Sequence, residues 1–116
     1  MNDVETLVAE LRRFVAERDW AQFHDPKNLA MLLASEVGEL VAEYRWVAGP
    51  AADAHSRAEA PRARIADEIG DVGIALLLLC DRTGIDLFQA VAAKLTKNRA
   101  RYPVEKSRGK AERPTE

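Results

Sequence analysis

Apolar residues recur every three to four positions through most of this chain, and this helical periodicity restricts its fold more than any other feature. On a helix expected over about residues 3–18, the apolar stripe consists of Val4, Leu7, Val8, Leu11, Phe14 and Val15. Further helices are expected over about residues 27–47, 61–82 and 86–101. The pattern predicts an all-α fold, with a four-helix bundle-like protomer.

Helix-start and helix-stop residues separate these segments. Asp25-Pro26 is typical of a helix start, and Gly49-Pro50, Thr83-Gly84 and Pro103 indicate helix ends. Residues 48–60 have no periodicity and are expected to form a mobile loop. Residues 104–116 form a polar tail that is expected to be disordered on its own, so one domain is expected over residues 1–103.

Composition narrows the classes of protein further. The chain has 116 residues, enough for one domain, and its net charge is -2, with 17 basic and 19 acidic side chains. Proteins that bind nucleic acid polymers usually have an excess of basic residues, so such a partner is not expected here. The longest apolar run, residues 72–80, is far shorter than the roughly 20 residues of a membrane span. The first residues lack a signal-peptide pattern, and the single Cys80 is typical of a reducing compartment, so a cytoplasmic location without membrane partners is expected.

Two acid pairs stand where apolar residues are expected. Glu36 and Glu39 are three residues apart, as are Glu68 and Asp71, so each pair shares one helix face. At about 100° per residue, both faces coincide with the leucine-rich faces of their helices. The four carboxylates are therefore expected on buried faces.

A buried ionised carboxylate needs a basic partner, a proton or a metal ion. The chief basic candidate on an interior face is Lys94, and one lysine cannot neutralise four acids. Oxygen ligands suit Mg²⁺, Mn²⁺ or Ca²⁺, whereas a zinc site would need more cysteine or histidine. A di-iron site is not expected, because neither His24 nor His55 follows a glutamate by three positions. The alternative is that the acids are solvated and the buried faces lie elsewhere.

Carboxylate-bound Mg²⁺ commonly binds phosphates as well, so the acids indicate metal-assisted hydrolysis of a phosphate anhydride. Trp20, His24 and Trp46 flank the second helix and could stack on a nucleobase, or they could be packing residues. Lys94 and Asn98 share one face of the last long helix and could hold a phosphate, or they could lie at a solvated edge.

Three glycines interrupt the acid-bearing helices. Gly38, Gly70 and Gly73 each lie inside a helical segment, where glycine costs about 1 kcal/mol relative to alanine. They allow either close helix packing or space for a ligand beside the acids.

Taken together, these motifs resemble the all-α nucleoside triphosphate pyrophosphohydrolases of the MazG-like group, which carry Glu-x-x-Glu followed by Glu-x-x-Asp; here 28 residues separate the two motifs. The resemblance to the dCTP pyrophosphatase branch rests on residues 17–24 (ERDWAQFH), 26–29 (PKNL), 35–40 (SEVGEL), Trp46, Lys94, 98–99 (NR) and 101–103 (RYP). The chain departs from this branch at Ala75, where relatives carry tyrosine, and this departure bears on base or sugar selectivity.

This resemblance implies an Mg²⁺-dependent enzyme, with Mn²⁺ as a substitute, that cleaves a nucleoside triphosphate to the monophosphate and pyrophosphate. It implies dCTP or a modified dCTP as substrate and a role in clearing unwanted nucleotides. The implied metal ligands and catalytic residues are Glu36, Glu39, Glu68 and Asp71, and the implied substrate-binding residues are Trp20, His24, Trp46, Lys94 and Asn98. The alternatives are a metal-dependent nucleotide hydrolase of another specificity, or a non-catalytic helical oligomerisation or nucleotide-binding module.

The resemblance also implies dimers or tetramers, and the apolar third helix points the same way. A chain this short with four amphipathic helices has too little surface to cover that helix itself. A homodimer or homotetramer that buries it is therefore expected.

Overall fold

The computed structural model describes residues 2–114, which divide into two compact units with a boundary after Gly84. The first unit contains the helices α1 (Asp3–Glu17), α2 (Pro26–Ala42), α3 (Ala52–Arg57) and α4 (Glu59–Thr83), and the 3-10 helices η1 (Ala21–Phe23) and η2 (Gly49–Ala51). The second unit contains α5 (Leu87–Arg101) and α6 (Val104–Ser107). No residue from 2 to 114 is in a strand, and the prediction of an all-α fold is confirmed.

Side-chain caps begin α1 and α2 in the first unit. At α1, the Glu5 backbone N–H donates to Asn2 Oδ1 at 2.8 Å, and the Asn2 N–H donates to the Glu5 carboxylate at 3.1 Å. At α2, the predicted Asp25 cap accepts from the Asn28 N–H at 2.8 Å, and Pro26 occupies the first turn. These caps satisfy backbone donors that a helix start leaves without partners.

Helix α2 ends five residues earlier than the predicted limit of residue 47. Beyond Ala42 the backbone changes to tighter i-to-i−3 hydrogen bonds, from Glu43 N to Leu40 O at 3.1 Å and from Tyr44 N to Val41 O at 3.0 Å. Such bonds commonly tighten the last turn of a helix. The sequence periodicity continues through these turns, which is why it overestimates the length of the helix.

The prediction of a mobile loop over residues 48–60 is wrong. This segment contains η2 and α3, and α4 already begins at Glu59. The Tyr44 and Ser56 hydroxyls are 2.7 Å apart, and His55 Nε2 lies 3.0 Å from the Glu43 carbonyl oxygen. These contacts join α3 to the turn after α2, and a six-residue helix is too short for periodicity to reveal it.

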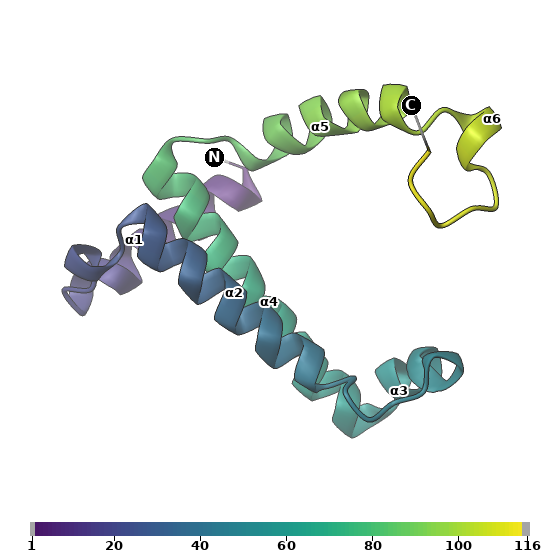
Figure 1. Cartoon of the computed structure of the whole chain (residues 1–116). Helices are drawn as coiled ribbons and strands as arrows, with labels where there is room; N and C mark the ends of the chain where they lie inside the picture. Colours follow the sequence, from purple (N-terminus) through teal and green to yellow (C-terminus); the bar gives the residue numbers. More distant parts are fainter. Residues whose placement is uncertain (1, 115–116) are drawn as a thin grey trace. The chain divides into compact units, whose positions relative to one another are not determined.

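Helices α2 and α4 lie side by side and antiparallel, and their interface forms the centre of the first unit (Figure 1). Leu29 of α2 and Ala75 of α4 are each 1% exposed, and Ile65 is also buried. The buried residues Leu11 and Val15 of α1 complete this core. Burial of a leucine side chain contributes about 2 kcal/mol, so Leu29 is a principal anchor of the pair.

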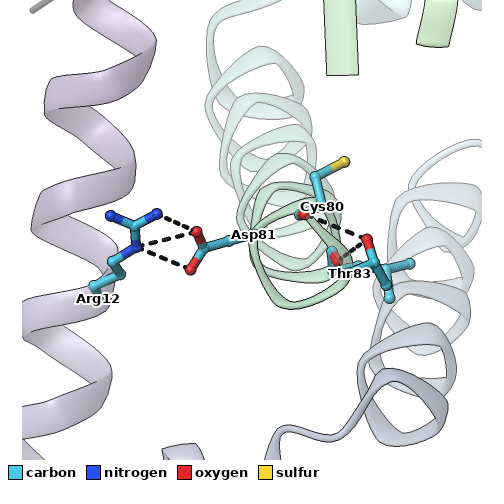
Figure 2. A network of polar contacts seen from close by, with 5 residues as sticks. Arg12, Cys80, Asp81 and Thr83 are labelled. Atoms are coloured by element: carbon cyan, nitrogen blue, oxygen red, sulfur yellow. Dashed lines mark hydrogen bonds and ion pairs between the residues drawn. The ribbon is translucent and has the colours of Figure 1, made fainter. Parts of the chain in front are cut away.

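An ion pair joins α1 to α4. The Arg12 guanidinium contacts the Asp81 carboxylate, and its Nε lies 3.0 Å from both carboxylate oxygens (Figure 2). Near it, the Thr83 hydroxyl donates to the Leu79 and Cys80 carbonyl oxygens at the end of α4. Gly84 then ends the helix with a left-handed φ of 71°, a conformation that favours glycine.

In the second unit, the Asp86 carboxylate caps α5 by accepting from the Gln89 N–H at 2.9 Å. None of the residues of α5 is buried. The short helix α6 occupies residues that were expected to be a disordered tail, so that expectation is wrong for Val104–Ser107. The expected domain boundary after residue 103 stays a prediction. No helix within residues 2–114 is long and apolar enough to cross a bilayer.

Candidate active site

Three carboxylates from α2 and α4 converge on one point. Glu36, Glu68 and Asp71 each offer one oxygen, and these oxygens all lie within 4.8 Å of one another. The i, i+3 spacing places Glu68 and Asp71 on one face of α4, and the antiparallel packing brings Glu36 of α2 against them. Glu39, the fourth predicted ligand, is not part of this trio.

Repulsion between the acids is visible at Glu68. Desolvation raises the pKa of Glu68 above its usual value, and the negative charges of Glu39, Asp71, Glu36 and Glu43 raise it further. Glu39 therefore acts electrostatically on the trio. A divalent cation would relieve this repulsion, because it favours the ionised form of every carboxylate around it.

The prediction that the four acids lie on buried faces is wrong for the single chain. Glu36 and Glu68 are half-buried, whereas Glu39 and Asp71 are exposed. The buried residues of the α2–α4 pair are Leu29, Ile65 and Ala75, and none of the four acids is buried. A helical projection gives the direction in which a side chain points, but not how far the neighbouring helix covers that side chain. A residue at the edge of a helix interface can therefore have the same projected direction as a residue at its centre.

A further acid-base contact lies one turn beyond the cluster. Arg64 Nε donates to the Glu43 carboxylate, at 3.0 Å from Oε1 and 3.4 Å from Oε2. The expectation that Lys94 is the chief basic partner missed Arg64. Its position four residues before Glu68 was the available signal, because residues four apart on a helix share a face.

Open space lies beside the acids. A Cβ atom built on Gly38, Gly70 or Gly73 would have no heavy atom of residues 2–114 within 4 Å, apart from the glycine itself, its two chain neighbours and the nearby backbone of its own helix. Close packing within the chain therefore does not explain these glycines. Two of them adjoin the acid pairs, which favours the interpretation that they leave room for a ligand.

The donor set suits a hard divalent cation. The converging ligands are carboxylate oxygens from a rigid helix pair, with no cysteine or histidine among them. Mg²⁺ and Mn²⁺ favour such ligands and leave positions for water or phosphate. The residues present therefore fit a magnesium or manganese ion at Glu36, Glu68 and Asp71, with Glu39 close enough to contribute charge.

The predicted aromatic residues occupy different places in the first unit. Trp20 is 43% exposed and packs edge-on against Phe14, with ring centroids 5.7 Å apart. Trp46 is 89% exposed, in the turn that follows α2. A Trp side chain this exposed makes little contribution to the core of its own chain, so a packing role within the chain is excluded for Trp46.

His24 lines a cavity of about 200 Å³ at the other end of the α2–α4 pair. The cavity wall is apolar at Leu29 and Leu78 and polar at Arg12, Asp81 and Arg82. Leu29 is seven residues before Glu36, about 10 Å along the helix axis, so the cavity is separate from the acid cluster. The contact between Arg12 and Asp81 could not be predicted from the sequence, because the two residues are 69 positions apart.

Lys94 and Asn98 lie one turn apart on α5, in the second unit. Lys94 is exposed and Asn98 is half-buried. Their link to the acids of the first unit stays a prediction.

The sequence profile of the MazG-like family matches residues 50–116, more than half of the chain. The match includes Glu68, Asp71, Lys94 and Asn98, whereas Glu36 and Glu39 lie before it.

Similar proteins extend this likeness to the α2 residues. The chain is 45% identical over 113 residues to dCTP pyrophosphatase 1 of Bos taurus and 43% identical over 111 residues to that of Mus musculus. Each alignment covers 96% of this chain and 64% of the relative. The human protein of the same name is 39% identical over 116 residues. The chain thus spans slightly less than two thirds of the length of these relatives.

A solved structure is similar in fold. The crystal structure of a pyrophosphatase from Archaeoglobus fulgidus matches with a TM-score of 0.80 and 35% identity, covering 89% of this chain and 94% of that one. The chain belongs to the MazG-like family.

Proposed function

We propose that this chain is an Mg²⁺-dependent nucleoside triphosphate pyrophosphohydrolase. It cleaves the bond between the α- and β-phosphates and releases a nucleoside monophosphate and pyrophosphate. The names of the relatives support dCTP or a modified dCTP as the substrate. Such an activity would remove unwanted nucleotides from the cellular pool.

The observation that carries this proposal is the convergence of Glu36, Glu68 and Asp71 within 4.8 Å. Three like charges at this separation repel one another, and the pKa of Glu68 is raised by desolvation first and then by the neighbouring negative charges. A polyphosphate would be repelled as well unless cations lay between it and the acids. When bound, Mg²⁺ neutralises phosphate charge and lowers the pKa of a bound water.

Each candidate residue has a proposed role. Glu36, Glu39, Glu68 and Asp71 hold the metal and orient the attacking water for in-line displacement at phosphorus. Trp20, His24 and Trp46 bind the nucleoside, and the exposure of Trp46 supports a role outside its own core. Lys94 and Asn98 bind phosphate oxygens. We also propose that residues 1–103 form the catalytic domain, since all these positions lie within it.

A homodimer or homotetramer is proposed as the active form. Ile69 and Ile74 of α4 are 55% and 41% exposed, and α5 exposes Phe88, Val91 and Leu95. Apolar side chains in such number on a short chain support burial against further copies. Light scattering coupled to size exclusion measures the assembly. We also propose a cytoplasmic location, which the single cysteine fits.

A nucleotide panel with Mg²⁺, resolved by chromatography of the products, tests the activity. The expected products from dCTP are dCMP and pyrophosphate, formed only when the metal is present. Release of orthophosphate instead would contradict cleavage between the α- and β-phosphates. Hydrolysis of no nucleotide by a folded, metal-loaded chain would favour a non-catalytic module.

A further inference from the structure

The ion pair between Glu43 and Arg64 continues the arrangement that builds the acid cluster. Glu43, the C-cap residue that ends α2, follows Glu39 by one turn, and along α4, Arg64 precedes Glu68 by one turn. Because the two helices are antiparallel, one turn forward on α2 meets one turn backward on α4. One turn from the acid cluster, α4 thus presents the cation Arg64 to Glu43, where the cluster itself has the acid Glu68.

Glu43 has the surroundings of a cluster member. Its side chain is only 16% exposed, whereas the Arg64 side chain is 56% exposed. Glu43 lies four residues after Glu39, and its ion-pair partner Arg64 lies four residues before Glu68, so the pair borders the trio. Both Glu43 carboxylate oxygens are engaged by Arg64 Nε, at 3.0 and 3.4 Å.

We propose that Arg64 is a positioning residue, which holds Glu43 in an ion pair and so keeps a fifth carboxylate away from the metal and the triphosphate. This inference rests on the proposed function, because it assumes that a divalent cation binds at Glu36, Glu68 and Asp71. Mg²⁺ sites that act on phosphates keep coordination positions for the substrate. A free Glu43 would compete for such a position and would repel the incoming polyphosphate.

Mn²⁺ alone, without nucleotide, is the probe, and its affinity is measured by calorimetry and by electron paramagnetic resonance. Arg64→Ala should bind Mn²⁺ at least about threefold more tightly than the parent, because it frees one carboxylate and removes one nearby cation. Arg64→Lys should restore parental affinity. Arg62→Ala is the matched control: it removes an arginine charge two residues away that makes no ion pair within residues 2–114, and it should bind as the parent does.

The double variant Arg64→Ala with Glu43→Gln tests whether Glu43 causes the tighter Mn²⁺ binding expected of Arg64→Ala. In this double variant the increase in Mn²⁺ affinity should disappear. Glu43→Gln alone leaves Arg64 without its partner and should weaken Mn²⁺ binding, so it tests the proposal even if Arg64→Ala folds poorly. Circular dichroism checks the fold of each variant.

Two results would overturn the inference: unchanged or weaker binding by folded Arg64→Ala, or a double variant that stays as tight as Arg64→Ala. A parent protein whose Mn²⁺ binding is absent, or is unaffected by Asp71→Asn, would instead remove the metal site itself and the proposed function with it.

Discussion

Arg12 of α1 binds Asp81 of α4 through a guanidinium nitrogen that lies 3.0 Å from each carboxylate oxygen. The contact closes one wall of the cavity that His24 also lines. It is the one ion pair between α1 and α4 within residues 2–114. The position of α1 against the α2–α4 pair therefore depends on this contact and on buried Leu11 and Val15.

The first prediction concerns acid. The hydrogen bond from Arg12 holds the pKa of Asp81 below its usual range. A carboxylate with a lowered folded-state pKa adds stability above its unfolded-state pKa, and that stability is lost as the pH falls through the folded-state pKa. Asp81→Asn should lower the midpoint of urea unfolding slightly near pH 7, and this loss should shrink at acid pH as the pH falls through the folded-state pKa and the Asp81 carboxylate becomes protonated. An equal loss at neutral and at acid pH would contradict an electrostatic role.

The second prediction concerns the metal-free cluster, for which the sign is opposite. Glu68 has a raised pKa, so its contribution to stability is present at low pH and is lost as the pH rises through its folded-state pKa. Glu68→Gln should therefore stabilise the metal-free protein at neutral pH, and Mn²⁺ should stabilise the parent more than the variant. Thermal unfolding with and without Mn²⁺ measures both effects. A lower melting temperature for metal-free Glu68→Gln would argue against repulsion at the cluster.

The third prediction concerns the core. Leu29→Ala should cost about 2–5 kcal/mol of unfolding free energy, because Leu29 is 1% exposed and its truncation leaves a cavity between α2 and α4. Met31→Ala, on the same helix but at a 61% exposed side chain, should cost less than about 1 kcal/mol. Urea unfolding monitored by circular dichroism compares them. Equal losses of unfolding free energy in the two variants would contradict the burial of Leu29 between α2 and α4.

The fourth prediction concerns the proposed chemistry. Asp71→Ala should lower kcat at least about hundredfold, equivalent to about 2.7 kcal/mol, while the fold is retained. The loss is expected because Asp71 supplies one of the three converging oxygens. Asp67→Asn is a suitable control, since it changes an exposed acid on the same helix outside the trio. Dependence on Asp67 rather than Asp71 would contradict the proposed ligand set.

The fifth prediction concerns the nucleoside. Adding a nucleotide with Mg²⁺ should change the tryptophan fluorescence, since Trp46 is 89% exposed and Trp20 is 43% exposed. In Trp46→Phe the change should be smaller. A nucleotide-induced change equal to that of the parent would remove Trp46 from the base site.

The amino-acid sequence was sufficient to predict the helical class and the cap at Asp25, because periodicity and capping depend on local spacing. The grouping of Glu36, Glu68 and Asp71 was also predictable once both acid pairs were assigned to helix faces. Neither the depth of these acids nor the pairs Arg12–Asp81 and Glu43–Arg64 could be predicted. They depend on how two helices meet, and a single helix gives no information about that.

The antiparallel pair of α2 and α4 has a consequence for how such a protein diversifies. The acid cluster and the cavity at His24 are carried by the same two helices, about two helical turns apart. Because both features lie on the same helices, the rise per residue of the helix sets the distance between them, and no loop conformation affects it. Substitutions that line the cavity can thus accumulate during evolution without changing the positions of the acids at the other end of the helix pair.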